Sequence, residues 1–280
     1  MIAPTMPAGA SAVRPSAVES LELAASVYRS ARAGWEGPLS AGIDLGTATC
    51  VIAVLDATGR AVWLDSRATE AVRDGVVVDY WGARDATASL KADAETALGI
   101  QLSRASTAFP PGIGVSDSRA CQYVLEAAGF DDVMLLDEVS AANETLGIVD
   151  GVVVDVGGGS TGVGVLRGGI LTSLDDKPGG GHHLDLILAG ALGIPLAEAE
   201  ELKRNHPAGY LGILRPGIER IAESIRSLSV GSEELDVHLA GGALMIDGAD
   251  KIIGDYLGRS VRSYPHALYI TPLGIARHAS

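Results

Sequence analysis

The feature that most constrains the fold of this 280-residue chain is a short pattern that occurs twice. Residues 41–56, AGIDLGTATCVIAVLD, run from an apolar strand through Asp44 into a Gly-Thr turn and a second apolar strand. Residues 151–173, GVVVDVGGGSTGVGVLRGGILTS, repeat this order, and Asp155 lies 111 residues after Asp44. Because aspartate is depleted from strands, its return at the same place indicates an internal duplication and two similar lobes.

Each half is expected to begin with a three-stranded meander and to continue in alternating helices and strands, which predicts the α/β class. In the first half the pattern predicts strands at 42–46, 49–55, 61–65, 73–80, 105–109 and 132–136, and helices at 85–98, 117–128 and 138–146. In the second half it predicts three strands within 151–173, helices at 182–192, 195–206 and 216–228, a strand at 235–240 and a helix at about 272–279. We therefore expect a first lobe at 41–150 and a second at 151–280.

Residues 1–40 differ from the rest because they are rich in Ala, Pro, Ser and Gly. Within them, residues 16–34 have helical spacing, and Ser16 followed by Glu19 is typical of a capping box. We expect an N-terminal extension with an amphipathic helix that is loosely attached and dispensable for ligand binding. The alternative is a helix that docks on a partner.

Composition limits the classes of partner. The formal net charge of −14 and the pI near 4.8 repel nucleic acid and anionic membranes. A polyphosphate ligand would need a cation or backbone amides. The two cysteines have no metal-ligand spacing and no secretory signal precedes the fold, so we expect a reduced, cytoplasmic protein without a membrane span.

The glycines at 157–162 match the letters of the dinucleotide fingerprint GxGxxG, but a strand follows them instead of the helix that a Rossmann site needs. The chain also contains no GxxxxGK[ST] motif. A glycine-rich hairpin can still bind phosphate, because its amides can point at one anion. Side-chain hydroxyls beside the two turns could donate further hydrogen bonds to the phosphate. These are the hydroxyls of Thr47, Thr49, Ser160 and Thr161.

Two such hairpins, one in each lobe, would bind a polyphosphate from both sides. Asp44 and Asp155 at their bases would repel the phosphates unless a cation lay between them. Mg²⁺ suits this place, because it binds one or two carboxylates together with substrate phosphates. The alternative is a pair of ordinary hairpins with solvated aspartates.

These motifs resemble those of the actin, DnaK-type chaperone and sugar-kinase ATPases. Residues 43–47 and 152–161 are similar to the two phosphate motifs, and 137-DEVSAA-142 to the first connecting helix. Residues 237-VHLAGGALMIDGA-249 are similar to the adenosine motif, and 271-TPLGIA-276 to the second connecting helix. The resemblance implies two actin-like, ribonuclease H-like lobes around a nucleotide cleft, with the C-terminal helix crossing back to the first lobe.

Within this superfamily, residues 40–280 resemble the ethanolamine utilisation EutJ family. The similar segments include 73-RDGVVVDY-80, 108-AFPPG-112, 179-GGGHHLDLILAG-190 and 198-EAEELKR-204. The resemblance implies a chaperone or assembly factor encoded with bacterial microcompartment enzymes. Its partners would be ATP or ADP and a microcompartment enzyme or shell protein.

The resemblance also implies roles for individual residues. Asp44 and Asp155 would hold the Mg²⁺ shell, and Glu138 would polarise the attacking water. Phosphate would be contacted by Gly46, Thr47, Thr49, Gly157, Gly158, Gly159, Ser160 and Thr161. The nucleoside would be contacted by Glu200, Lys203, Arg204, Gly241 and Gly242.

Three departures indicate slow hydrolysis of ATP. Many relatives have an aspartate where this chain has Gly162, and proline is usual at the place of Val139. The first lobe contains no lysine before Lys91, so the phosphate-contacting lysine of DnaK-type chaperones has no counterpart. Besides a slow ATPase switch, the sequence leaves open a nucleotide-bound scaffold without useful catalysis and a small-molecule kinase.

Overall fold

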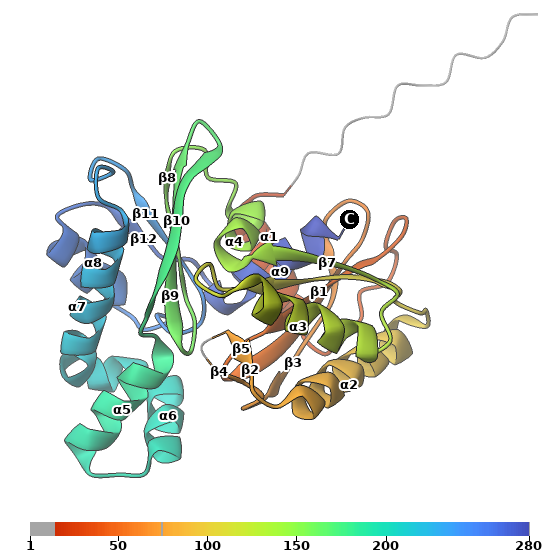
Figure 1. Ribbon diagram of the computed structural model, residues 1–280, viewed down its shortest axis with the longest axis horizontal. Helices are drawn as coiled ribbons and strands as arrows, with labels where there is room; N and C mark the ends of the chain where they lie inside the picture. Colours follow the sequence, from red (N-terminus) through yellow and green to blue (C-terminus); the bar gives the residue numbers. More distant parts are fainter. Residues whose placement is uncertain (1–14, 74, 280) are drawn as a thin grey trace, which may run out of the picture.

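Two five-stranded sheets of the same topology form the framework of the computed structural model, which describes residues 15–73 and 75–279 (Figure 1). The first sheet has the order β3-β2-β1-β6-β7 and contains β1 (Ser40–Leu45), β2 (Thr49–Leu55), β3 (Ala61–Ala68), β6 (Arg104–Phe109) and β7 (Asp132–Asp137). The second has the order β10-β9-β8-β11-β12 and contains β8 (Gly151–Val156), β9 (Ser160–Arg167), β10 (Ile170–Pro178), β11 (Val237–Ala240) and β12 (Val261–Arg262). The expected α/β class with two similar lobes is confirmed.

The duplication extends to the pairing of strands. Asp44 lies opposite Val51 in the antiparallel ladder of β1 and β2, and Asp155 lies opposite Gly162 in the ladder of β8 and β9. In each sheet the third antiparallel strand follows on one side and two parallel strands on the other. The two aspartates therefore occupy equivalent positions at the carboxyl ends of equivalent central strands.

Helices cover the faces of both sheets, and each lobe has its own apolar core. The first lobe contains α2 (Tyr80–Leu98) and α3 (Val115–Ala127). The second contains α5 (Gly181–Leu192), α6 (Leu196–Asn205), η1 (Pro207–Tyr210), α7 (Leu211–Leu228), α8 (Ala249–Leu257) and η2 (Ala267–Tyr269). None of the helices in 15–73 and 75–279 has the length and apolar character needed to span a membrane.

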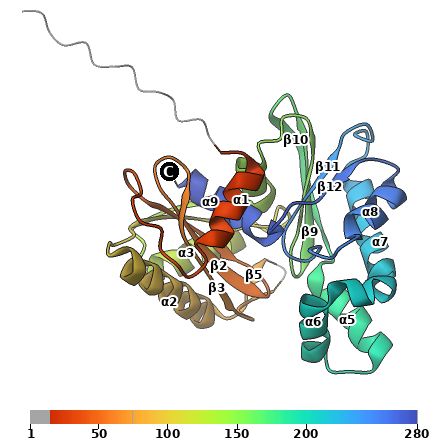
Figure 2. The same ribbon diagram turned by 180° about the vertical axis from the view of Figure 1, so that it is seen from behind.

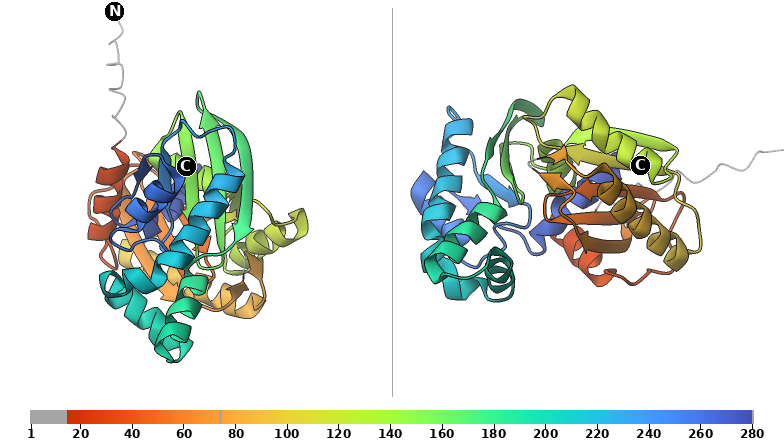
Figure 3. Two further views of the ribbon diagram at one scale, coloured as in Figure 1. Left: turned by 90° about the vertical axis from the view of Figure 1, so that its left-hand side faces the viewer. Right: turned by 60° about the horizontal axis from the view of Figure 1, so that its bottom comes forward.

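Two helices are exchanged between the lobes. α4 (Glu138–Leu146) follows the last strand of the first sheet and packs on β8 and β9. α9 (Ile270–His278) follows the second lobe and packs on β1, β2 and β6 (Figure 3). The two helices also pack closely on one another, because Gly274 of α9 has no side chain where it meets the Ala141 carbonyl of α4. Any movement of one lobe relative to the other therefore involves this helix pair.

The strand predicted at 73–80 is wrong. The chain forms a small hairpin of β4 (Val72–Arg73) and β5 (Val76–Val77) instead, and Gly75 has a φ of +77°. α2 then begins at Tyr80, five residues before its predicted start, because the Asp79 side chain accepts a hydrogen bond from the Gly82 amide and caps the helix.

The expectation of a loosely attached N-terminal helix is also wrong. α1 (Ala17–Ser26) has the predicted capping box of Ser16 and Glu19, but it packs against β3, α4 and η2 (Figure 2). Leu21 and Ala24 are fully buried. The buried Arg277 of α9 donates to the hydroxyl of Ser20 at 2.8 Å and to the Glu144 carbonyl of α4 at 2.9 Å. The part of the predicted N-terminal linker at 1–14 lies outside the described residues.

Replacing Leu21 by alanine is therefore expected to lower the free energy of unfolding by about 2–5 kcal/mol, the usual cost of a cavity in a core. Val18 lies on the same helix but is 45% exposed, so Val18→Ala is the matched control and should change stability by less than about 0.5 kcal/mol. Urea denaturation of the full chain measures both. Equal effects of the two substitutions would show that α1 is not part of the folded core.

Candidate functional site

The two predicted phosphate hairpins face one another across the two lobes. The first joins β1 to β2 and the second joins β8 to β9. A side-chain carbon added to Gly158 would lie 3.1 Å from Cβ of Thr47 and 3.6 Å from the Ala48 amide nitrogen. The absence of a side chain at Gly158 therefore lets the tips of two equivalent turns, from different lobes, approach closely.

The second hairpin is braced from behind by the turn that precedes α5. The amides of Gly179, Gly181 and His182 donate to the carbonyls of Gly159, Gly157 and Gly158 at 2.8–2.9 Å. The hydroxyl of Thr161 is buried and donates to the Gly179 carbonyl at 2.6 Å. Thr161 thus supports the hairpin from inside, whereas the sequence pattern suggested a phosphate contact for its hydroxyl.

Three acidic side chains converge beside the hairpins. Burial raises the pKa of Asp44 to about 7, and the nearby charge of Asp155 adds to this effect. Burial also raises the pKa of Asp155 to about 6, although a hydrogen bond from the Thr271 hydroxyl of α9 works in the opposite direction. Glu138, at the first position of α4, has a pKa raised well above its ordinary value by burial and then by Asp155 and Asp44. Asp155 acts on both Asp44 and Glu138, and Asp44 acts on Glu138, so the three carboxyl groups lie near one another beside the hairpins.

Two further residues of this site were not predicted. Thr271 fixes Asp155 from the start of the lobe-crossing helix α9. Asp176 of β10 lies directly opposite Gly162 in the β9–β10 ladder, and its charge contributes to the raised pKa of Glu138. A hydrogen bond from the Gly112 amide of the first lobe to Asp176 also crosses between the lobes. Asp176 has no local sequence signal, because strand pairing brings it to the site, whereas Thr271 begins the segment 271-TPLGIA-276 that resembles the second connecting helix.

Val139 and Gly162, the two residues described above as departures from the superfamily pattern, pack against one another. A side-chain carbon at Gly162 would lie 3.2 Å from Val139 Cγ2 and 3.6 Å from Pro111 Cδ. A side-chain carbon at Gly164 would lie 2.5 Å from Cγ1 of the same valine. The space beside Gly162 is therefore occupied by Val139 and Pro111, and the carboxylate of Asp176 lies on the neighbouring strand β10.

The predicted nucleoside residues lie at the α5–α6 end of the second lobe. Lys203 is mostly buried, pairs with Asp185 at 2.7 Å and donates to the Gly181 carbonyl at 2.8 Å. It therefore holds the start of α5 beside the phosphate hairpin. Glu200 and Arg204 form an exposed ion pair at 2.5 Å on the same helix, α6.

The predicted glycines at 241–242 follow β11 and enter the acidic site. Gly241 has a φ of +83°, and a side-chain carbon there would lie 2.5 Å from Asp155 Oδ1. A side-chain carbon at Gly242 would lie 3.0 Å from Leu268 Cδ1. Glycine is needed at Gly241 both for its backbone conformation and to leave room for the Asp155 carboxylate.

The donor set fits a magnesium ion that is shared with a phosphate ligand. Asp44 and Asp155 offer carboxylate oxygens at the bases of two facing hairpins, and burial raises the pKa of both groups. No group of three or more His, Cys, Asp or Glu side chains among the residues described could hold a metal ion by itself. A Mg²⁺ ion here would need phosphate oxygens as further ligands, which is its usual mode of binding.

The chain is 35% identical over 257 residues to the ethanolamine utilization protein EutJ of Salmonella typhimurium, and the match covers 91% of each chain. The crystal structure of EutJ from Carboxydothermus hydrogenoformans superposes with a TM-score of 0.88 at 38% identity, covering 93% of this chain and 97% of that one. No protein-family profile matches the chain.

A more distant likeness shows the fold alone. MreB5 of Spiroplasma citri, solved with AMPPNP, has a TM-score of 0.71 at 16% identity, covering 85% of this chain and 95% of that one. The same protein solved with ADP has a TM-score of 0.68 at 16% identity, covering 84% and 94% of the two chains. The two lobes therefore have the actin-like fold.

Proposed function

Since the chain belongs to the EutJ family of ethanolamine utilization proteins, we propose that it is an ATP-binding molecular switch that hydrolyses ATP slowly. The observation that carries this proposal is the facing pair of hairpins, each with an aspartate at its base and with Thr47 and Gly158 in close approach. MreB5, which shares the fold, has been solved with ADP and with AMPPNP. Both facts favour a nucleotide whose phosphates lie between the lobes.

The residues around the hairpins would have different roles in nucleotide binding and hydrolysis. Amides and hydroxyls at 46–49 and 157–160 bind the phosphates, and Gly241 leaves room for Asp155. Asp44 and Asp155 would hold Mg²⁺, which neutralises phosphate charge when bound. Thr271 orients Asp155, and Glu138 accepts a hydrogen bond from the attacking water. At the α5–α6 end, Glu200, Lys203 and Arg204 would contact the ribose and base.

The output of the switch is proposed to be a protein contact. ATP binding would move one lobe relative to the other about α4 and α9, and only surfaces that differ between the two states can report this movement. The family relationship supports a cytoplasmic role with an enzyme or shell protein of an ethanolamine-type microcompartment. The net charge of −14 disfavours nucleic acid and anionic membranes as partners.

A calorimetric titration with Mg·ATP, with Mg·ADP and with ATP plus EDTA tests nucleotide binding. We expect binding of Mg·ATP, with turnover below the ~1 s⁻¹ that is typical of enzymes. Glu138→Gln should bind Mg·ATP like the wild type but release phosphate at least about tenfold more slowly. Glu126→Gln, at an exposed glutamate of α3, is the matched control and should leave both quantities unchanged.

The same measurements separate the alternatives. Binding of Mg·ATP by the wild type without measurable phosphate release would favour a nucleotide-bound scaffold without useful catalysis. Absence of Mg·ATP binding to the wild type would overturn the proposed function itself. A small-molecule kinase would show rapid consumption of ATP only when an acceptor is added.

A further inference from the structure

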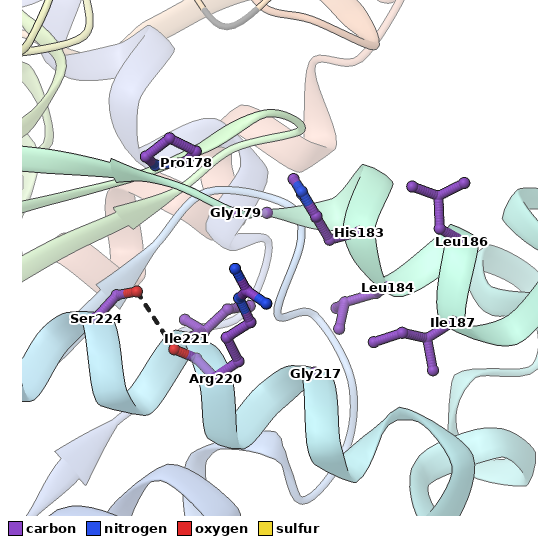
Figure 4. Close-up of a pocket in the computed structure, with 11 residues that line it drawn as sticks. Pro178, Gly179, His183, Leu184, Leu186, Ile187, Gly217, Arg220, Ile221 and Ser224 are labelled. Atoms are coloured by element: carbon purple, nitrogen blue, oxygen red, sulfur yellow. Dashed lines mark hydrogen bonds between the residues drawn. The ribbon is translucent and has the colours of Figure 1, made fainter.

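A pocket of about 270 Å³ lies in the second lobe, behind the turn that braces the phosphate hairpin (Figure 4). Leu184 and Ile187 of α5 and Ile221 of α7 supply apolar walls, and Pro178 and Gly179 close one end. The pocket exists because α5 and α7 meet at Gly217, where an added side-chain carbon would lie 2.6 Å from Leu184 Cδ2. None of the residues proposed to contact the nucleotide lines it.

An arginine stands at the rim of this apolar pocket. The Arg220 side chain extends from α7 towards Pro178 and Gly179 (Figure 4). It is exposed, and no hydrogen bond or ion pair engages its guanidinium within 15–73 and 75–279. This guanidinium beside an apolar pocket, on a protein of net charge −14, is complementary to a ligand that is both apolar and anionic.

The apolar surface continues beyond the pocket. Leu186 lines the rim and is 49% exposed. The volume of about 270 Å³ lies just below the ~300–1,000 Å³ typical of small-molecule sites, which favours one apolar side chain over a larger ligand. A peptide can place one side chain in the pocket, rest the next residues on Leu186 and present a carboxylate to Arg220.

We propose that the pocket between α5 and α7 binds a peptide segment of a protein partner, in which a leucine-sized side chain stands beside a carboxylate. The apolar side chain enters between Leu184, Ile187 and Ile221, and the carboxylate pairs with Arg220. This site does not depend on the proposed nucleotide site for its existence.

The pocket is connected to the proposed nucleotide site by its lining. Gly179 and Gly180 line the pocket, and the Gly179 amide donates to the Gly159 carbonyl of the phosphate hairpin at 2.8 Å. A side-chain carbon at Gly180 would meet the carbonyls of Gly157 and Gly158, so the turn at 179–180 is packed tightly against the phosphate hairpin. A peptide that shifts this turn shifts the hairpin, and we infer, on the basis of the proposed function, that the peptide and Mg·ATP change one another's affinity.

The test uses two blocked peptides, acetyl-Ala-Leu-Glu-Ala-amide and the same peptide with Gln for Glu, titrated into the full chain without nucleotide. Amide chemical shifts around Gly179 and Ile221 report binding. We expect both peptides to bind, the Glu peptide about two- to fivefold more tightly, as for a partly exposed ion pair. Arg220→Gln should remove this preference, and Ser224→Leu, which fills the pocket, should remove binding of both peptides.

Arg215→Gln is the matched control, because Arg215 lies on the same helix but pairs with Glu219 and does not line the pocket. It should retain the preference for the Glu peptide. Equal affinities of the two peptides, an unchanged preference in Arg220→Gln, or no shifts at the pocket would overturn the site. Repeating the calorimetric titration of Mg·ATP with saturating Glu peptide should change the affinity about fivefold or more. An unchanged affinity would overturn the coupling, whereas absence of Mg·ATP binding without peptide would count only against the proposed function.

Discussion

Replacing Asp44 by asparagine is expected to stabilise the nucleotide-free protein above neutral pH and to abolish its magnesium-dependent binding of ATP. The carboxyl has its pKa raised from an ordinary value of 3.8 to about 7, chiefly by burial and then by Asp155. Below the ordinary pKa the group is protonated in both the folded and the unfolded state. As the pH rises towards 7, the unfolded state loses its proton more readily, so the native state becomes progressively less stable.

The size of this effect follows from the pKa. A displacement from 3.8 to about 7 corresponds to at most about 4 kcal/mol in the free energy of unfolding. An asparagine cannot ionise, so Asp44→Asn should recover much of this free energy at pH 8 and none of it near pH 4. Asp155→Asn should act in the same direction but less strongly, since its pKa is raised only to about 6. Both variants lose a cation ligand, and Mg·ATP should no longer raise their melting temperature.

Urea denaturation at pH 4 and pH 8, together with melting curves with and without Mg·ATP, measures these changes. Asp131→Asn is the matched control, because Asp131 is an exposed aspartate of the same lobe, and it should behave like the wild type throughout. If Asp44→Asn destabilised the nucleotide-free protein at pH 8, or retained the Mg·ATP shift, the carboxylates would not form the repelling pair described above.

The repeated aspartates made the two similar lobes predictable, because the duplicated sequence pattern folds into strands that pair in the same way in both sheets. Asp44 and Asp155 have equivalent ladder partners in Val51 and Gly162, and those partners are also 111 residues apart. The hairpin glycines, too, are local features whose conformational need can be recognised from sequence. Local pattern thus predicted the first sheet and four strands of the second, but not the short edge strand β12, which consists of two residues.

What the sequence could not predict depends on contacts between distant segments. Ser20 and Arg277 are 257 residues apart, yet their buried hydrogen bond attaches α1 to the lobe-crossing helices. Asp176 enters the site only because β10 pairs with β9 at Gly162. The strand predicted at 73–80 depended on the β-branched residues of this segment. Gly75 and Asp79 decide its structure instead, because Gly75 forms the turn of the small hairpin and Asp79 caps α2.

The second large effect is expected at Gly274, where α9 meets α4. A methyl group at this position would overlap the Ala141 carbonyl oxygen, and the same helix also abuts β1 near Gly42. In an unhindered helix, Gly→Ala stabilises by up to about 1 kcal/mol. Gly274→Ala must instead separate two helices that are packed between the lobes, and overpacking of this kind costs about 1–3 kcal/mol or more.

The matched control is Gly190→Ala in α5, because a side-chain carbon there would meet nothing within 4 Å. Urea denaturation should show Gly190→Ala at or above wild-type stability and Gly274→Ala at least about 2 kcal/mol below it. Since Thr271 on the same helix holds Asp155, displacement of α9 should also weaken Mg·ATP binding, which Gly190→Ala should leave intact. If Gly274→Ala proved as stable as the control, α4 and α9 would have room to separate without cost, and their close contact could not couple the two lobes.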